Sequence, residues 1–62
     1  MLYSQLVMAH ILLVEDDEDN ISLLTRLLEH HGHTLSIATD GETAVARARQ
    51  ERPEIILMDL EL

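Results

Sequence analysis

The stretch Glu54-Ile55-Ile56-Leu57-Met58-Asp59-Leu60 decides the fold of this 62-residue chain. Its four apolar residues run together and end at one acid, a pattern typical of a strand buried on both faces of a parallel sheet. An earlier stretch has the same pattern, because Ile11-Leu12-Leu13-Val14 ends at Glu15-Asp16-Asp17. The carboxyl ends of parallel strands meet at one edge of an open α/β sheet, where such sheets keep their sites. The sequence therefore predicts a pocket of three or more carboxylates at this edge.

The segment after the first apolar run predicts a helix with one apolar stripe. The members of this stripe are Ile21, Leu24, Leu27 or Leu28, and His31. We expect Asp19 or Asn20 to cap the start of the helix, because their side-chain oxygens can accept hydrogen bonds from its exposed amides. Gly32 suits the left-handed residue that commonly follows a helix.

A shorter strand and a second helix are predicted next. Residues 34–38 alternate between apolar and polar side chains, as an edge strand does, and a helix is expected over about residues 43–51. Thr39 or Asp40 can cap this helix, and Pro53 ends it. The β-α-β-α-β order predicts an α/β fold in which the strands are parallel and the crossovers right-handed.

The chain is strongly acidic, with 12 Asp and Glu against 4 Lys and Arg and a formal net charge of -8. This charge argues against direct binding of nucleic acid or an anionic membrane, and it favours a cation or a basic protein surface as partner. No stretch approaches the roughly 18 apolar residues that a membrane span needs. Cysteine is absent, which is compatible with a reducing cytoplasm, the location that we predict.

Clustered carboxylates repel one another unless they bind a hard cation through oxygen. Mg²⁺ suits such a site, because it accepts one or two carboxylates together with waters and a phosphate oxygen. An Asp beside the cation can attack phosphorus as a nucleophile. The pattern alone predicts a divalent cation at the sheet edge, but it does not assign a phosphoryl acceptor.

Other interpretations of the acids and histidines are weaker. A calcium loop that starts at Asp17 fails, because Ser22 stands where the loop needs Gly and Leu28 where it needs Glu. A solvated loop that caps a helix is the preferred interpretation for Asp17 itself. The histidines within residues 30–33 lack an obvious fourth ligand, and the negative end of the helix dipole explains two of them.

Three segments, in this order, resemble the receiver domain of bacterial two-component response regulators. They are Ile11-Leu-Leu-Val-Glu-Asp-Asp17, Ala38-Thr-Asp-Gly-Glu-Thr-Ala44 and Arg52-Pro-Glu-Ile-Ile-Leu-Met-Asp-Leu60. The resemblance covers roughly residues 9–62. It implies a flavodoxin-like, doubly wound parallel sheet with strand order 2-1-3-4-5, of which receivers are a known example.

The resemblance also implies roles for individual residues. Asp59 would be the phosphoacceptor, and a histidine kinase or a histidine phosphotransfer protein would supply the phosphoryl group. Mg²⁺ would be bound by the side chains of Asp16 and Asp59, by Glu15 through water, and by the backbone carbonyl of Glu61. Such a domain would be a signalling module and not an enzyme. After it accepts the phosphoryl group it changes the surface that it presents to partners, and it does not act as a catalyst on a diffusible substrate.

The chain also departs from the family. A receiver continues for two more strands and three more helices, with a hydroxyl residue after strand four and a lysine after strand five, whereas this chain contains no lysine. We therefore expect the β-α-β-α-β half of the sheet, truncated after strand three and impaired as an acceptor. Residues 1–8 would be an N-terminal extension and residues 9–62 the receiver domain. Residues 55–58 would form an exposed edge strand, which predicts a homo-oligomer joined through this edge.

Two other functions stay open. A haloacid-dehalogenase-like, Mg²⁺-dependent phosphatase also uses an Asp at a strand end, but it needs Asp-x-Asp after its first strand, and Asp59-Leu60-Glu61 follows the third. A half-domain that only dimerises or competes with intact receivers is the second alternative. A receiver keeps one phosphoryl group on Asp59, a phosphatase turns over, and an interaction fragment does neither.

Overall fold

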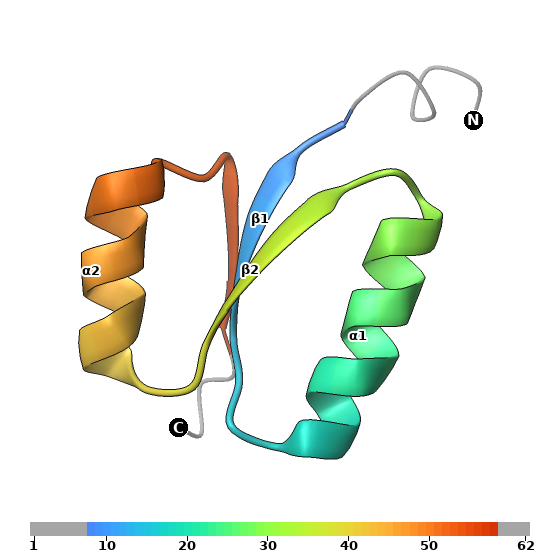
Figure 1. Cartoon of the computed structure of the whole chain (residues 1–62), viewed down its shortest axis with the longest axis horizontal. Helices are drawn as coiled ribbons and strands as arrows, with labels where there is room; N and C mark the ends of the chain where they lie inside the picture. Colours follow the sequence, from blue (N-terminus) through green and yellow to red (C-terminus); the bar gives the residue numbers. More distant parts are fainter. Residues whose placement is uncertain (1–7, 59–62) are drawn as a thin grey trace.

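Three parallel strands form one sheet in which the first strand lies in the middle (Figure 1). The structure is a computed structural model and describes residues 8–58. Its elements are β1 (His10–Val14), α1 (Glu18–His30), β2 (Thr34–Ala38), α2 (Gly41–Glu51) and β3 (Ile55–Met58). The strand order is β2-β1-β3. The predicted α/β class, the β-α-β-α-β order and the flavodoxin-like 2-1-3 arrangement are therefore confirmed.

β1 is buried on both of its faces, because each face of the sheet carries a helix. The side chains of residues 11–14 are at most 2% exposed. Leu12 packs in the core with Ala44 of α2, whereas Leu13 borders a cleft that Leu24 of α1 also lines. Successive strand residues point to opposite faces, so a continuous apolar strand needs cover on both. Figure 1 shows that α1 and α2 lie on opposite sides of the sheet and supply this cover.

α1 begins three residues earlier than Ile21, where the apolar pattern places its start, because Asp17 caps it. The Asp17 carboxylate accepts hydrogen bonds from the backbone N–H groups of Asp19 at 2.8 Å and Asn20 at 3.1 Å. The prediction that Asp19 or Asn20 is the N-cap is thus wrong, since both lie in the first turn. Glu18 adds further negative charge there, which the positive end of the helix dipole favours.

α1 ends in a Schellman motif at Gly32, which confirms the prediction for this glycine. The N–H of His33 donates to the carbonyl of Leu28 at 3.2 Å, and Gly32 has a φ of 90°, in the left-handed region. The placement of His31 in the apolar stripe is wrong, because this residue is the exposed C-cap. Leu27 and Leu28 were the two alternatives for the third position of the stripe. Leu28 is half-buried and Leu27 is 50% exposed, so Leu28 is the member of the stripe.

α2 starts at an N-cap and ends at a left-handed residue. The Asp40 carboxylate accepts a hydrogen bond from the Thr43 backbone N–H at 2.7 Å, so Asp40, and not Thr39, is the N-cap. This hydrogen bond lowers the pKa of Asp40, because it favours the charged carboxylate. Arg52 has a φ of 50° at the end of α2, and Pro53 follows it as predicted.

β3 departs from the prediction of a strand buried on both faces. Its four side chains are between 36% and 51% exposed, although its sequence is as apolar as that of β1. The difference follows from position, since β3 pairs with β1 along one edge and no other strand within residues 8–58 pairs with its second edge. The prediction that residues 55–58 form an exposed edge strand is confirmed.

A polar cluster connects the end of α2 to β1 and β2. His10 Nε2 donates to Glu51 Oε1 at 3.0 Å, and His10 Nδ1 lies 2.8 Å from the Thr34 hydroxyl. The Ser36 hydroxyl also donates to Glu51, and Arg47 Nη1 donates to its second oxygen at 3.1 Å. A carboxylate can only accept, so this arrangement requires a proton on Nε2 of His10. The hydrogen bond from Ser36 and, after it, that from His10 lower the pKa of Glu51 to about 2.

We expect Gly32→Ala to lower the free energy of unfolding by about 1 kcal/mol, because alanine is strained in the left-handed region. The added Cβ would meet no close neighbour, since the nearest atom, Met8 Cγ, is 3.8 Å away. Gly41→Ala is the matched control, because Gly41 begins α2 without a positive φ and its added Cβ meets no atom within 4 Å. Urea denaturation should therefore show unchanged or slightly raised stability for Gly41→Ala. Equal losses for both variants would contradict the conformational explanation.

The polar cluster should make stability depend on pH in the acid range. Glu51 has a pKa of about 2 in the folded chain, against an ordinary value of 4.5. A lowered pKa stabilises the fold fully above the ordinary value, and this contribution is lost as the pH falls from 4.5 towards 2. Glu51→Gln should therefore lose less stability than the parent across this window in thermal melts. Glu42→Gln, which changes an exposed acid of the same helix, should follow the parent. Identical pH dependence of the parent and Glu51→Gln would refute the assignment.

Candidate functional site

Glu15 follows β1 at the carboxyl edge of the sheet with its side chain turned inward. Its backbone N–H donates to the Ala38 carbonyl at 3.0 Å, which extends the contact between β1 and β2 by one residue. Glu15 is 5% exposed, and its carboxylate accepts a hydrogen bond from the Asp17 backbone N–H at 3.2 Å. Burying a carboxylate is costly unless it is paired. Glu15 is therefore well suited to face a cation.

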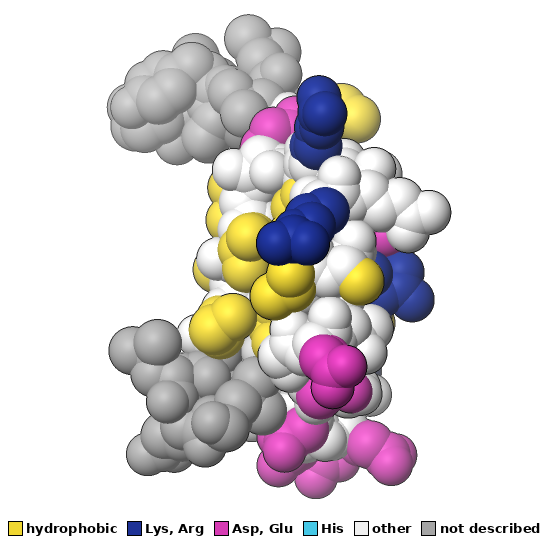
Figure 2. Space-filling view, turned by 90° about the vertical axis from the view of Figure 1, so that its left-hand side faces the viewer, with side chains coloured by type: hydrophobic (Ala, Val, Ile, Leu, Met, Phe, Trp, Pro, Cys, Tyr) yellow, Lys and Arg dark blue, Asp and Glu magenta, His cyan; other side chains and the backbone are white. Residues whose placement is uncertain are grey.

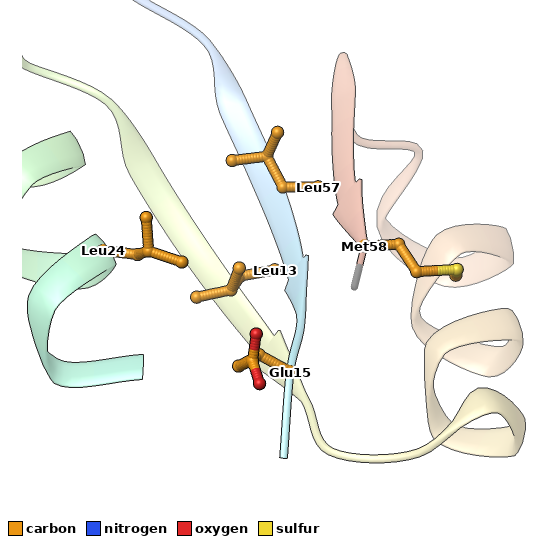
Figure 3. Close-up of a pocket in the computed structure, with 5 residues that line it drawn as sticks. All are labelled: Leu13, Glu15, Leu24, Leu57 and Met58. Carbon is orange, nitrogen blue, oxygen red and sulfur yellow. The ribbon is translucent and has the colours of Figure 1, made fainter. Parts of the chain in front are cut away.

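A cleft of ≈ 250 Å³ lies beside Glu15. Figure 3 shows Leu13 of β1, Leu24 of α1 and Leu57 of β3 around it, with the Glu15 carboxylate at its lower end. Met58 also borders the cleft, although its side chain points towards α2 in this view. Apolar walls reduce the local dielectric, which strengthens the interaction of a carboxylate with any cation beside it.

The two acids after Glu15 have different environments. Asp16 is exposed, whereas the Asp17 carboxylate is occupied by two backbone N–H groups as the cap of α1. Asp17 therefore serves the helix, in agreement with the interpretation preferred from the sequence. Asp40, which follows β2, is likewise occupied as a cap. Among the described acids at this edge, Glu15 and Asp16 remain the candidate cation ligands.

Asp59 and Glu61, the other two predicted ligands, lie outside the described residues. Within residues 8–58, no group of three or more His, Cys, Asp or Glu residues is arranged to hold a metal ion. The described part of the chain thus contains two of the four predicted ligands, Glu15 and Asp16.

The pairing of β1 with β3 relates the two ends of the predicted site. Val14 is the register partner of Met58 in this parallel pair. In the sequence, Glu15 follows Val14 and Asp59 follows Met58. Glu15 and Asp59 are therefore each the next residue in the sequence after a paired strand position, Val14 and Met58.

The histidines near the end of α1 make contacts within the fold. The rings of His30 and His31 meet edge to face, with 5.5 Å between their centroids. His33 Nδ1 accepts a hydrogen bond from the Ala9 backbone N–H at 3.1 Å. His33 thus supports the start of β1, a role that its position after a helix did not predict.

Comparison with known proteins finds one family for this chain. The model of the response regulator receiver domain matches residues 11–62, which include β3 and all of β1 except His10. The chain belongs to the response regulator receiver family. This receiver resembles the PilH protein of Pseudomonas aeruginosa, with 47% identity over 53 residues that cover 86% of the chain and 44% of PilH.

Other relatives of this receiver are larger still. It is 40% identical over 52 residues to the alkaline phosphatase synthesis transcriptional regulatory protein PhoP of Bacillus subtilis, covering 84% of the chain and 22% of PhoP. It is 44% identical over 52 residues to the response regulator PleD of Caulobacter vibrioides, covering 84% of the chain and 12% of PleD. The matched part of the chain thus covers less than half of each of these relatives. No solved structure matches it significantly.

Membership of this family confirms the resemblance seen in the sequence. Receivers are the phosphoryl-accepting modules of two-component signalling. Its two described helices are both too short and too polar to cross a membrane.

We expect Asp17→Ala to lower the free energy of unfolding by about 1 kcal/mol, because α1 loses its N-cap. Asp19→Ala is the matched control, since it removes an acid of the same turn that does not cap the helix. Its cost should be about 0.3 kcal/mol, through the helix dipole alone. Urea denaturation measures both variants, and a larger loss for Asp19→Ala would show that the cap is assigned to the wrong residue.

Proposed function

We propose that Asp59 accepts a phosphoryl group from a histidine kinase or a histidine phosphotransfer protein. The observation that carries this proposal is that the receiver match spans residues 11–62 while β1 and β3 are parallel neighbours in register. Val14 and Met58, which precede Glu15 and Asp59 in the sequence, form the last pair of that register. The two acids are therefore expected at one edge of the sheet.

Mg²⁺ fits the residues that are proposed to hold it. Glu15 is a buried carboxylate, and Asp16 is an exposed one next to it. We propose that the Asp16 and Asp59 side chains and the Glu61 backbone carbonyl bind the ion, with Glu15 acting through water. These are the oxygen ligands that Mg²⁺ prefers. When bound, the ion neutralises negative charge on the phosphoryl oxygens and on the carboxylates.

The transfer itself forms one bond and breaks one. A carboxylate oxygen of Asp59 attacks phosphorus, a P–O bond forms, and the P–N bond of the donor phosphohistidine breaks. The departing imidazole nitrogen keeps the bonding electron pair and takes up a proton from solvent. Asp59 must be ionised to attack, and a cation beside its carboxylate favours the ionised form.

We further propose that this chain, which has no lysine, accepts the phosphoryl group less efficiently than a lysine-containing receiver does. The family pattern includes a lysine that pairs with the phosphoryl group, and this chain contains no lysine. A fixed cation beside a developing negative charge commonly contributes several kcal/mol to such a step.

Intact-mass measurement after incubation with Mg²⁺ and acetyl phosphate tests the proposal. We expect a mass increase of one phosphoryl group on the parent and none on Asp59→Asn, because the amide is not a nucleophile towards phosphorus. Omitting Mg²⁺ should also remove the adduct. Asp40→Asn is the matched control, since it changes an acid that follows β2 but caps α2, and it should keep the adduct.

Each other outcome has a definite meaning. No adduct on a parent that circular dichroism shows to be folded would overturn phosphoryl acceptance by this chain. An adduct that persists on Asp59→Asn would place the acceptor elsewhere. Steady release of phosphate without an adduct would favour the phosphatase alternative.

A further inference from the structure

Three groups of Asp17 form hydrogen bonds, and these bonds reach both α1 and the candidate cation site. The Asp17 carboxylate accepts from the backbone N–H groups of Asp19 at 2.8 Å and Asn20 at 3.1 Å. Its carbonyl accepts a hydrogen bond from the Ile21 N–H at 2.9 Å, in the first turn of the helix. Its own N–H donates to the Glu15 carboxylate at 3.2 Å. Asp17 therefore connects the start of α1 directly to a candidate cation ligand.

The turn that carries the candidate ligands is fixed at both of its ends. On the strand side, the Glu15 backbone N–H donates to the Ala38 carbonyl of β2 at 3.0 Å. On the helix side, Asp17 has the extended backbone of an N-cap, with a φ of -85° and a ψ of 119°. Asp16 is the single residue between these two fixed points. The position from which its carboxylate extends therefore depends on the cap.

The hydrogen bond from Asp17 also restricts the side chain of Glu15. This side chain is 5% exposed, and a buried carboxylate that loses a hydrogen-bond donor is destabilised. If the cap opened, the Asp17 backbone would be free to rotate, and Glu15 would lose this donor. The orientation of the Glu15 carboxylate is therefore coupled to the cap.

Electrostatic repulsion opposes the compact form of this turn. Residues 15–19 are five consecutive acids. Figure 2 shows acidic side chains gathered at the lower end of the molecule, which is the end where Figure 1 places the carboxyl edge of the sheet. Like charges at short distance repel one another, which favours an open turn. The cap and a bound cation each oppose this repulsion in the same five residues, so each makes the other more favourable.

We propose that Asp17 is a positioning residue for the Mg²⁺ site, because the cap that it forms holds Glu15 and Asp16 in the arrangement that the ion requires. Asp17 acts through these two residues and is not itself a ligand. Since it concerns the same site, this role rests on the proposed function. Formation of the cap and binding of the ion are then coupled equilibria, and such coupling is reciprocal. Loss of the cap weakens the binding of the ion, and the ion stabilises the cap.

Titration of the full chain with Mg²⁺, followed by proton–nitrogen correlation spectra, tests the role of the cap without a phosphoryl donor. We expect Asp17→Ala to raise the Mg²⁺ dissociation constant about tenfold, the lower end of the effect of losing a group that orients a metal ligand. Asp17→Asn keeps a capping oxygen and removes one negative charge. It should bind Mg²⁺ as well as Asp19→Ala does, because that variant also removes one charge and leaves the cap intact. The same spectra show whether each variant is folded.

Gly32→Ala separates positioning from a general loss of stability. This variant also destabilises α1, but at the opposite end of the helix, where Gly32 has a φ of 90°. Its Mg²⁺ dissociation constant should equal that of the parent. Equal weakening of Mg²⁺ binding by Asp17→Ala and Gly32→Ala would show that Asp17 contributes only stability, and it would overturn the positioning role.

The parent chain alone provides a second test, which does not require Asp17→Ala to fold. Because the coupling is reciprocal, saturating Mg²⁺ should slow the solvent exchange of the Asp19 and Asn20 amides by a factor similar to the loss of affinity in Asp17→Ala. The Thr43 amide is the matched control, since it donates to Asp40, the cap of α2, at 2.7 Å. Its exchange should not change.

The other outcomes distinguish this role from the proposed function. Equal Mg²⁺ affinities for the parent and Asp17→Ala, or equal losses for Asp17→Ala and Asp17→Asn, would overturn the positioning role and leave the Mg²⁺ site in place. Unchanged exchange of the Asp19 and Asn20 amides in saturating Mg²⁺ would have the same meaning. A parent chain that binds no Mg²⁺ would remove the proposed site and the positioning role together. Phosphoryl acceptance is measured separately, by the adduct on Asp59.

Discussion

The structure depends on the burial of β1, which is shielded from water on both faces and along both edges. Leu12, Leu13 and Val14 are between 0% and 2% exposed, which requires β2 and β3 beside the strand and a helix on each face. Burial of one such side chain is worth about 1.5–3 kcal/mol, so three of them outweigh any single hydrogen bond in the chain. Glu15 is buried because it continues this strand before the backbone turns away. The packing of β1 in the core therefore fixes the position of the candidate cation site.

The local patterns predicted the elements of the sheet well, because strands and turns are set by neighbouring residues. The bounds of β2 and β3 agree with the prediction, and β1 is longer by one residue, His10. The burial of β3 could not be predicted in the same way. An apolar run specifies a strand, but its exposure depends on which elements lie beside it, and that is a property of the whole arrangement.

The roles of single side chains at the carboxyl edge of the sheet were likewise only partly predictable from the sequence. Acids after two apolar strands predict a carboxylate pocket, and Glu15 is indeed at the carboxyl edge. Three closely spaced residues, Asp17, Asp19 and Asn20, are all able to cap a helix, and only the tight turn after Glu15 selects Asp17. The bond between His10 and Glu51 joins residues 41 apart in the sequence, and no short-range pattern marks such a pair.

The position of β1 also has a consequence for the order in which the chain can fold. His10 pairs with Thr34, and Ile11 pairs with Ile55, so the partners of the central strand lie 24 and 44 residues further along the chain. Non-local strand pairs of this kind form slowly, because a long loop must close before any contact is gained. During synthesis the central strand therefore leaves the ribosome before both of its partners, and its pairing is completed last. Until β3 emerges, residues 11–14 are a segment that chaperones, or other nascent chains, can reach.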